Sequence, residues 1–160
     1  MYYTAFETPL CKMIIAGDET GITHLHLDCG KDQPRTFIID PDWEKNRSFF
    51  TEEIREIFEY LNGERKTFDI VVNPEGTAFQ HQVWAELMEI PYGETASYGD
   101  IAERLHNPGA ARAVGLANAK NPVPILIPCH RVVGADGDLT GFAFGIEIKE
   151  KLINLERGQA

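Results

Sequence analysis

The stretch NPVPILIPCHRVV, residues 121–133, is the most constrained part of this chain of 160 residues. Pro122, Pro124 and Pro128 each lack a backbone donor and fix φ, so the stretch cannot form a helix or the centre of a sheet. It still carries the apolar run 125–127, which favours burial. A rigid, buried, extended segment that ends in Cys129 and His130 predicts that one sulfur atom is held in one place.

Cys129 is the candidate nucleophile. A cysteine thiol has a pKa near ~8.5, and a neighbouring histidine or cation lowers it. Successive side chains of an extended segment point opposite ways. His130 would therefore act on the sulfur through a water or face a partner elsewhere. The alternative is a buried, unreactive cysteine, as many thiols in protein cores are.

The same stretch closely resembles the active-site signature of the O6-alkylguanine-DNA alkyltransferases, also called methylated-DNA–protein-cysteine methyltransferases. The similarity runs from about residue 77 to residue 156, roughly half of the chain. It implies that Cys129 accepts an alkyl group and that His130, a water and Glu156 form a relay that deprotonates it. It also implies that Asn121 helps to order the site. Such a relay joins a nucleophile, a base and a group that orients the base.

Composition predicts the broad class. With 18.0 kDa and 43% hydrophobic residues, the chain can bury a core as one domain or two small ones. Three cysteines without CxxC spacing argue against a disulfide framework and for a reducing cytoplasm. No signal peptide and no apolar run of about 18 residues is evident. We expect a cytoplasmic monomer that needs no cofactor and does not span a membrane.

The N-terminal part is predicted to be a small α+β unit. Alternating segments 12–16 and 21–27 predict two strands joined by a turn at 17–20, and 36–39 is a third candidate strand. The spacing of Ile54, Ile57, Phe58 and Leu61 predicts a helix over 48–61, and 68–72 predicts a last strand. No catalytic constellation is evident in this unit. The resemblance implies a ribonuclease H-like subdomain over residues 1–73.

A metal site near the N-terminus is not expected. Cys11, His24, His26 and Cys29 are the candidate ligands, and some members of the family carry zinc there. Their spacing matches no standard ligand pattern, and the two histidines already share one face of a predicted strand.

Helical patterns dominate after a linker at 73–76. Thr77 and Gln80 form a capping-box pattern, and Ser97 is a second N-cap candidate. Pro108 is predicted at the first position of a third helix that runs to about residue 120. Two short helices joined by a tight turn indicate a helix-turn-helix. We expect residues 77–160 to form a helical, winged-helix-like subdomain, which makes the whole fold α+β.

Charge and side-chain size both bear on DNA binding. The chain has a net charge of -10, but residues 92–131 are the one stretch that is not acidic, which permits DNA binding without proving it. The third helix is rich in alanine and glycine. A slim helix suits close approach, as in the minor groove, whereas a major-groove reader needs long polar side chains. Close packing against another helix in the core is the alternative.

The resemblance assigns roles on the DNA side. It implies a minor-groove helix-turn-helix that binds double-stranded DNA through Ser97, Tyr98, Ala111 and Arg112. The target guanine must leave the base stack before a thiolate can reach it. Arg112 would fill the vacated space, and Tyr98 would crowd the rotating phosphate and hydrogen-bond the guanine.

The glycine-rich loop 134–145 is expected to cover the base pocket, which the resemblance assigns to Tyr98, Arg131, Ala143 and Phe144. Where the family usually has paired glycines, this chain has Phe144-Gly145. The ring of Phe144 would narrow the pocket, or it would turn outward or pack on Phe142 and leave the pocket open.

The resemblance therefore predicts DNA repair by direct reversal, with irreversible transfer of the alkyl group from O6-alkylguanine to Cys129. O4-alkylthymine is a second candidate substrate. Two other classes of function compete with it. A lesion-binding module would flag damage without chemistry, which the presence of Cys129 disfavours. A Cys-His hydrolase would need an oxyanion hole, for which the sequence gives no signal.

Overall fold

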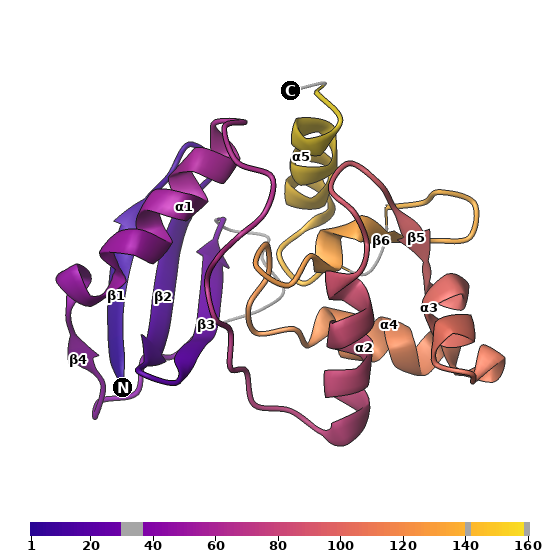
Figure 1. The fold of residues 1–160 in the computed structure, drawn as a ribbon, viewed down its shortest axis with the longest axis horizontal. Helices are drawn as coiled ribbons and strands as arrows, with labels where there is room; N and C mark the ends of the chain where they lie inside the picture. Colours follow the sequence, from indigo (N-terminus) through magenta and orange to yellow (C-terminus); the bar gives the residue numbers. More distant parts are fainter. Residues whose placement is uncertain (30–36, 140–141, 159–160) are drawn as a thin grey trace.

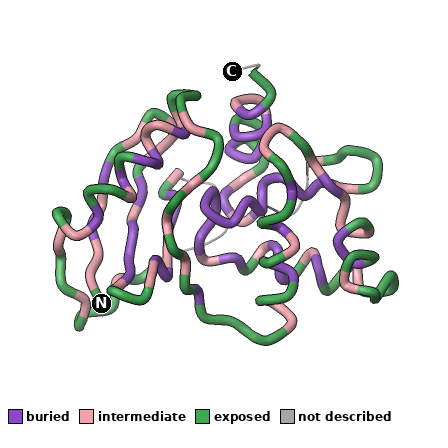
Figure 2. The backbone as a smooth tube through the Cα atoms, in the orientation of Figure 1, coloured by how far each residue is buried: buried purple, intermediate pink, exposed green. Residues whose placement is uncertain are grey.

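The computed structural model describes residues 1–29, 37–139 and 142–158. In Figure 1 an N-terminal sheet with one helix across it lies beside a C-terminal group of helices. Figure 2 shows the buried parts of the backbone where strands, helices and the segment before β6 (Val132–Val133) face one another. The architecture is α+β, as expected.

The N-terminal sheet has the strand order β3-β2-β1-β4. It comprises β1 (Tyr2–Glu7), β2 (Lys12–Asp18), β3 (Gly21–Asp28) and β4 (Glu44–Lys45). The first three strands are antiparallel neighbours, and β4 runs parallel to β1. The prediction of β2 and β3 is confirmed. The sequence analysis missed β1, although Thr4 and Phe6 are buried at alternate positions along it.

Two predicted strands are absent. Residues 37–39 form no strand, and Thr36 lies outside the described residues. The ring of Phe37 instead stacks on His26, with the ring centroids 5.1 Å apart. In the segment 68–72 only Val72 forms a bridge, to Ile22. The backbone N–H of Asp69 donates to the carboxylate of Glu56 at 2.8 Å, so it is not available to a neighbouring strand.

A single helix covers one face of this sheet. A 3₁₀ turn, η1 (Arg47–Phe50), leads into α1 (Thr51–Leu61), as the apolar spacing predicted. Met13 pairs with Leu27 and Ile15 with Leu25, so all four side chains lie on the same face of the sheet. They share the hydrophobic core with Ile57 of α1. The helix is followed by Gly63, whose φ of 77° suits a residue without a Cβ.

In residues 78–139 and 142–158 the C-terminal part comprises four α-helices and a two-stranded parallel sheet. They are α2 (Ala78–Met88), β5 (Ala96–Ser97), α3 (Tyr98–Arg104), α4 (Ala111–Ala119), β6 and α5 (Ile146–Glu156). Thr77 and Ser97 cap α2 and α3 through full capping boxes, which confirms both predicted caps. Pro108 opens a 3₁₀ turn, η2 (Pro108–Ala110), that runs into α4. Within the described ranges, every helix is too short or too polar to cross a membrane.

Candidate active site

The segment 121–133 is rigid and buried but, contrary to expectation, it is not extended. The N–H of Ile127 donates back to the carbonyl of Val123 at 2.9 Å, so the chain turns sharply there. Ile125 has a φ of 74°, a left-handed conformation that is costly for a β-branched residue. Asn121 fastens the turn, because its Nδ2 donates to the carbonyl of Ile127 at 2.8 Å and its Oδ1 accepts from the N–H of Val123 at 2.9 Å.

The turn delivers Cys129 to the start of η3 (Cys129–Arg131), a single 3₁₀ turn. The N–H of Cys129 donates to the carbonyl of Ile127 at 2.8 Å. Its own carbonyl accepts from Nδ2 of Asn118 at 3.3 Å and from the N–H of Val132. The residue is only 3% exposed. The backbone around the sulfur is therefore fixed from both sides, and Asn118 of α4 is a contributor that the sequence analysis did not identify.

His130 contacts Glu156 directly. Its Nε2 lies 2.7 Å from Oε2 of Glu156, at the last residue of α5, and the His130 side chain is fully buried. Glu156 also accepts from Arg131, whose Nε lies 2.8 Å from Oε1 and whose Nη2 lies 2.9 Å from Oε2. The hydroxyl of Tyr60 donates to Oε2 at 2.5 Å. We call Tyr60, His130, Arg131 and Glu156 the carboxylate cluster.

Contacts within the carboxylate cluster determine the protonation states of Glu156 and His130. Burial works against the charge of Glu156, but hydrogen bonds from His130 and Arg131 hold its pKa well below the usual range. Burial also lowers the pKa of His130, with Glu156 opposing. At neutral pH a neutral imidazole therefore donates from Nε2 to an ionised carboxylate. Nδ1 keeps its lone pair, and it is buried without a hydrogen-bond partner in the described part of the protein.

Lys149 adds a buried cation near the sulfur. It lies on α5, and its side chain has no exposed surface. Burial lowers its pKa to about 8, and the negative charge of a Cys129 thiolate opposes that shift. A positive charge within electrostatic reach favours the thiolate form of a cysteine. The sequence analysis missed Lys149, because a lysine among charged residues at 147–151 resembles an ordinary solvated helix face.

Two members of the carboxylate cluster differ from expectation. Arg131 was expected in the base pocket, but its guanidinium is occupied by Glu156 and by the carbonyl of Ile90, 2.7 Å from Nη1. Tyr60 comes from α1, in the subdomain where no catalytic constellation was expected, and it joins the cluster by donating a hydrogen bond to Glu156. Nothing in the sequence singles out Tyr60, since it lies outside the apolar spacing that predicted the helix.

The helix-turn-helix places the predicted DNA-binding residues on neighbouring helices. Tyr98 is the first residue of α3, and its ring lies 3.7 Å from where a Cβ on Gly115 of α4 would stand. Arg112 is exposed near the start of α4, next to the half-buried Ala111.

The slim helix α4 has one packed and one open face. Val114 and Ala117 are buried, and the indole N–H of Trp84 donates to the carbonyl of Ala117 at 3.0 Å. Ala113 and Leu116 are exposed, the latter by 62%. The helix therefore packs against the core on one side and exposes Arg112, Ala113 and Leu116 on the other.

The ring of Phe144 packs inward on its own loop and on the sheet. Its centroid lies 5.7 Å from that of Phe142 and 5.6 Å from the ring of His26 on β3. These are the contacts of the second alternative, in which the ring packs on Phe142. Ala143 between them is half-buried, and residues 140–141 of the loop lie outside the described residues.

The candidate metal ligands near the N-terminus have other neighbours. His24 and His26 contact the rings of Phe37 and Trp43 or Phe144. The sulfurs of Cys11 and Cys29 lie 3.2 Å apart. Among residues 1–29, 37–139 and 142–158, no three His, Cys, Asp or Glu side chains gather as a metal site would require.

Comparisons with known proteins agree with this arrangement. Residues 1–74 match a family model described as the ribonuclease-like domain of 6-O-methylguanine DNA methyltransferase, and residues 78–158 match the model of its DNA binding domain. A methylated-DNA–protein-cysteine methyltransferase of Methanosarcina acetivorans is 49% identical over 98% of both chains. One from Haemophilus influenzae is 44% identical over 98% of this chain and 87% of its own.

A solved structure has the same fold throughout. The crystal structure of Mycobacterium tuberculosis OGT in complex with DNA superposes with a TM-score of 0.90 and 40% sequence identity. The match covers 100% of this chain and 95% of the other.

Proposed function

Because the chain belongs to the 6-O-methylguanine DNA methyltransferase family, we propose that Cys129 is its alkyl acceptor and that the carboxylate cluster activates it. The protein repairs DNA by direct reversal: it takes the alkyl group from the O6 of guanine in double-stranded DNA onto its own cysteine. A thioether has no leaving route, so each molecule acts once. The observation that carries the residue assignment is the open Nδ1 of His130, the residue after Cys129 in the chain, on a ring that Glu156 orients through Nε2.

The transfer is a displacement at the alkyl carbon. The thiol proton of Cys129 passes through a water to Nδ1 of His130, and the resulting imidazolium is stabilised by the carboxylate of Glu156. Lys149 contributes positive charge beside the thiolate. The sulfur then attacks the alkyl carbon in line with the bond to O6. Guanine leaves with that bond's electron pair and takes a proton from the hydroxyl of Tyr98.

Access to the lesion requires base flipping, because O6 is paired inside the duplex. We place α4 in the minor groove, because a helix rich in alanine and glycine permits close approach. Arg112 occupies the gap in the stack, and Tyr98 crowds the rotating nucleotide. Ser97 and Ala111 contact the backbone near the two helix starts, while Ala143 and Phe144 belong to the loop over the pocket.

We further propose that the chain works as a cytoplasmic monomer with two units, residues 1–73 and 77–160. The two family models, which match 1–74 and 78–158, support this division. The function requires no soluble cofactor, since nucleophile, base and alkyl donor are all supplied by the protein and the DNA.

The test is intact-mass measurement after mixing the protein with duplex that contains O6-methylguanine. Wild type should gain one methyl group, and peptide mapping should place it on Cys129. Cys129→Ser should gain none yet still bind the duplex, because a hydroxyl has similar volume but is much harder to deprotonate. Cys11→Ser is the matched control and should react like wild type. A methyl on Cys11 or Cys29 would overturn the assignment, and binding without transfer by wild type would identify a lesion-binding module.

A further inference from the structure

Two cysteines outside the active site face each other at the end of the sheet. The β2–β3 ladder ends with the pair Lys12 and Asp28, so Cys11 and Cys29 stand opposite each other one position further on. Their sulfurs lie 3.2 Å apart, and both residues are thiols in this structure. Opposite residues of antiparallel strands have Cα atoms about 4.5–5.5 Å apart, within the range of about 4.4–6.8 Å that a disulfide spans. Side-chain rotation alone can therefore bring the sulfurs to bonding distance.

Cys11 is held in position by the turn before β2. Oγ1 of Thr8 accepts from the N–H of Cys11 at 3.1 Å and donates to its carbonyl at 2.6 Å. The N–H of Thr8 also donates to that carbonyl, at 3.2 Å. Oxidation would therefore require little further ordering of the chain at Cys11.

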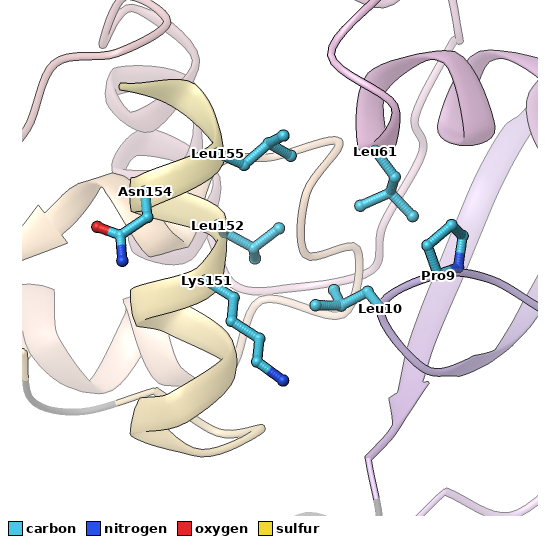
Figure 3. A pocket seen from close by; sticks show the side chains of 7 residues that line it. All are labelled: Pro9, Leu10, Leu61, Lys151, Leu152, Asn154 and Leu155. Carbon is cyan, nitrogen blue, oxygen red and sulfur yellow. The ribbon is translucent and has the colours of Figure 1, made fainter. Parts of the chain in front are cut away.

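The pair is more accessible than the catalytic cysteine. Cys11 and Cys29 are half-buried, whereas Cys129 is only 3% exposed. A cleft of about 330 Å³ is lined by Pro9 and Leu10, the two residues that precede Cys11, by Leu61 and by residues of α5. Figure 3 shows Leu10 and Pro9 projecting into it from the turn, with Lys151 and Leu152 on the facing side of α5. The partial exposure of both thiols lets small solutes reach them without entering the site of Cys129.

The two thiols are electrostatically unequal. The hydrogen bond with Cys11 is the main reason that the pKa of Cys29 lies below its usual range; Lys151 lowers it further, while burial and Asp28 oppose. The same hydrogen bond, with burial and the acidic Asp28 and Glu7, raises the pKa of Cys11. The neighbouring charges, Lys151 near Cys29 and Glu7 near Cys11, therefore suit Cys29 to attack first and Cys11 to resolve the product.

We propose that Cys11 and Cys29 form a reversible dithiol–disulfide site that exchanges with low-molecular-weight disulfides of the glutathione type. The Cys29 thiolate attacks one sulfur of the small disulfide, forming a mixed disulfide and expelling one thiolate. The thiol of Cys11 loses its proton to solvent, and its sulfur attacks Sγ of Cys29. The second thiolate leaves and is protonated. In sum, two protein thiols are oxidised to one disulfide, and one small disulfide is reduced to two thiols.

The experiment incubates the full-length protein with a graded series of oxidised and reduced glutathione, followed by intact-mass measurement and peptide mapping. Wild type should lose about 2 Da, the mass of two hydrogens, and should retain no glutathione at equilibrium. Cys11→Ser should trap one glutathione on Cys29, because the resolving sulfur is gone. Cys29→Ser should be modified more slowly than Cys11→Ser, because Lys151 favours the thiolate of Cys29 whereas the acidic Glu7 disfavours that of Cys11. Circular dichroism checks that each variant is folded.

Excess reduced glutathione should return the oxidised protein to the mass of the dithiol form. The oxidised form should melt a few degrees higher than the dithiol form, because a cross-link restricts the unfolded chain. The proposal is overturned if wild type keeps a stable glutathione adduct on either residue, if the disulfide includes Cys129, or if no oxidation occurs. Equal rates for the two serine variants would also overturn it, because the order of attack would then be absent. None of these outcomes depends on alkyl transfer.

Discussion

Replacing Glu156 with glutamine should damage stability and rate together, and the carboxylate cluster lets both be estimated. Oε2 accepts from His130, Tyr60 and Arg131, at 2.7, 2.5 and 2.9 Å, and Oε1 accepts from Arg131 at 2.8 Å. An amide can accept on one side only, so its NH₂ group must face the donor Nε of Arg131. The buried guanidinium also loses its counter-charge. Breaking a buried pair in this way costs about 3–5 kcal/mol.

For a chain of this length such a loss lowers Tm by roughly 10 °C, at about 2–4 °C per kcal/mol. The rate of transfer should fall but not vanish, because an amide oxygen can still accept from Nε2 of His130. Loss of a charged hydrogen bond worth about 1.5–3 kcal/mol corresponds to roughly 10- to 100-fold. Denaturant unfolding at pH 7 and single-turnover transfer, at a temperature where the variant is folded, measure the two effects.

Glu150→Gln, at an exposed position of the same helix α5, is the matched control and should change neither quantity. Adding Arg131→Met to Glu156→Gln should recover part of the stability, since no unpaired guanidinium remains. The pH dependence of stability in acid should also depend on the carboxylate of Glu156. Its folded pKa is depressed, so its contribution is present above the unfolded pKa of about 4.3 and is lost as pH falls further; the glutamine variant should lack this loss. A stability within about 1 kcal/mol of wild type would refute the reasoning, because a buried pair cannot be broken so cheaply.

Three further predictions concern the sulfur, the DNA face and the loop. Lys149→Met should slow transfer. It should also remove the rise in stability expected for wild type between pH about 8 and about 10.4, where the unfolded lysine binds the proton that the folded one has lost. The exposed Lys151→Met is the control, and an unchanged pH profile of stability in Lys149→Met would contradict this. Arg112→Ala should slow repair of duplex more than repair of a short single strand. Equal losses of rate on the two substrates would show that Arg112 only contacts a phosphate. Lys120→Ala, at the other end of α4, is the control. Phe144→Ala should cost about 3 kcal/mol by removing ring contacts with Phe142 and His26, yet leave the ratio of O6-benzylguanine to O6-methylguanine transfer rates nearly unchanged. A ratio that shifts severalfold towards benzyl would show that the ring narrows the pocket.

The structural features that the sequence predicted correctly depend mostly on residues that lie close together in the chain. Thr77 and Ser97 act through N–H groups three residues away, so their capping patterns are visible locally, and both caps are present. The apolar spacing of α1 and the turn between β2 and β3 are equally local. The prolines of the segment 121–133 indicate from the sequence alone that it is rigid. Its turn was not predicted, because it depends on the side chain of Asn121 and on a left-handed Ile125.

The residues that sequence reasoning missed act across long separations. Tyr60 lies 96 residues from Glu156, and Asn118 lies 11 from Cys129 on a different element. Lys149 is distinguished only by burial, which no local pattern reveals. The failed strand at 37–39 has the same origin, since its apolar side chains were assigned to strand pairing while Phe37 in fact stacks on the histidine face of β3. Local chemistry was predictable, whereas the partners brought by tertiary contacts were not.

Because the hydroxyl of Tyr60 on α1 donates to Glu156, the carboxylate cluster is complete only when the two parts of the chain are folded against each other. Residues 78–158 can form their caps and turns from local contacts, but the carboxylate receives its full set of donors only after the first 74 residues have folded and docked. A clipped or half-assembled molecule would present its cysteine to stray electrophiles with a poorly oriented base. A hybrid that combines halves from different relatives needs an N-terminal half that places a tyrosine hydroxyl next to the carboxylate of Glu156.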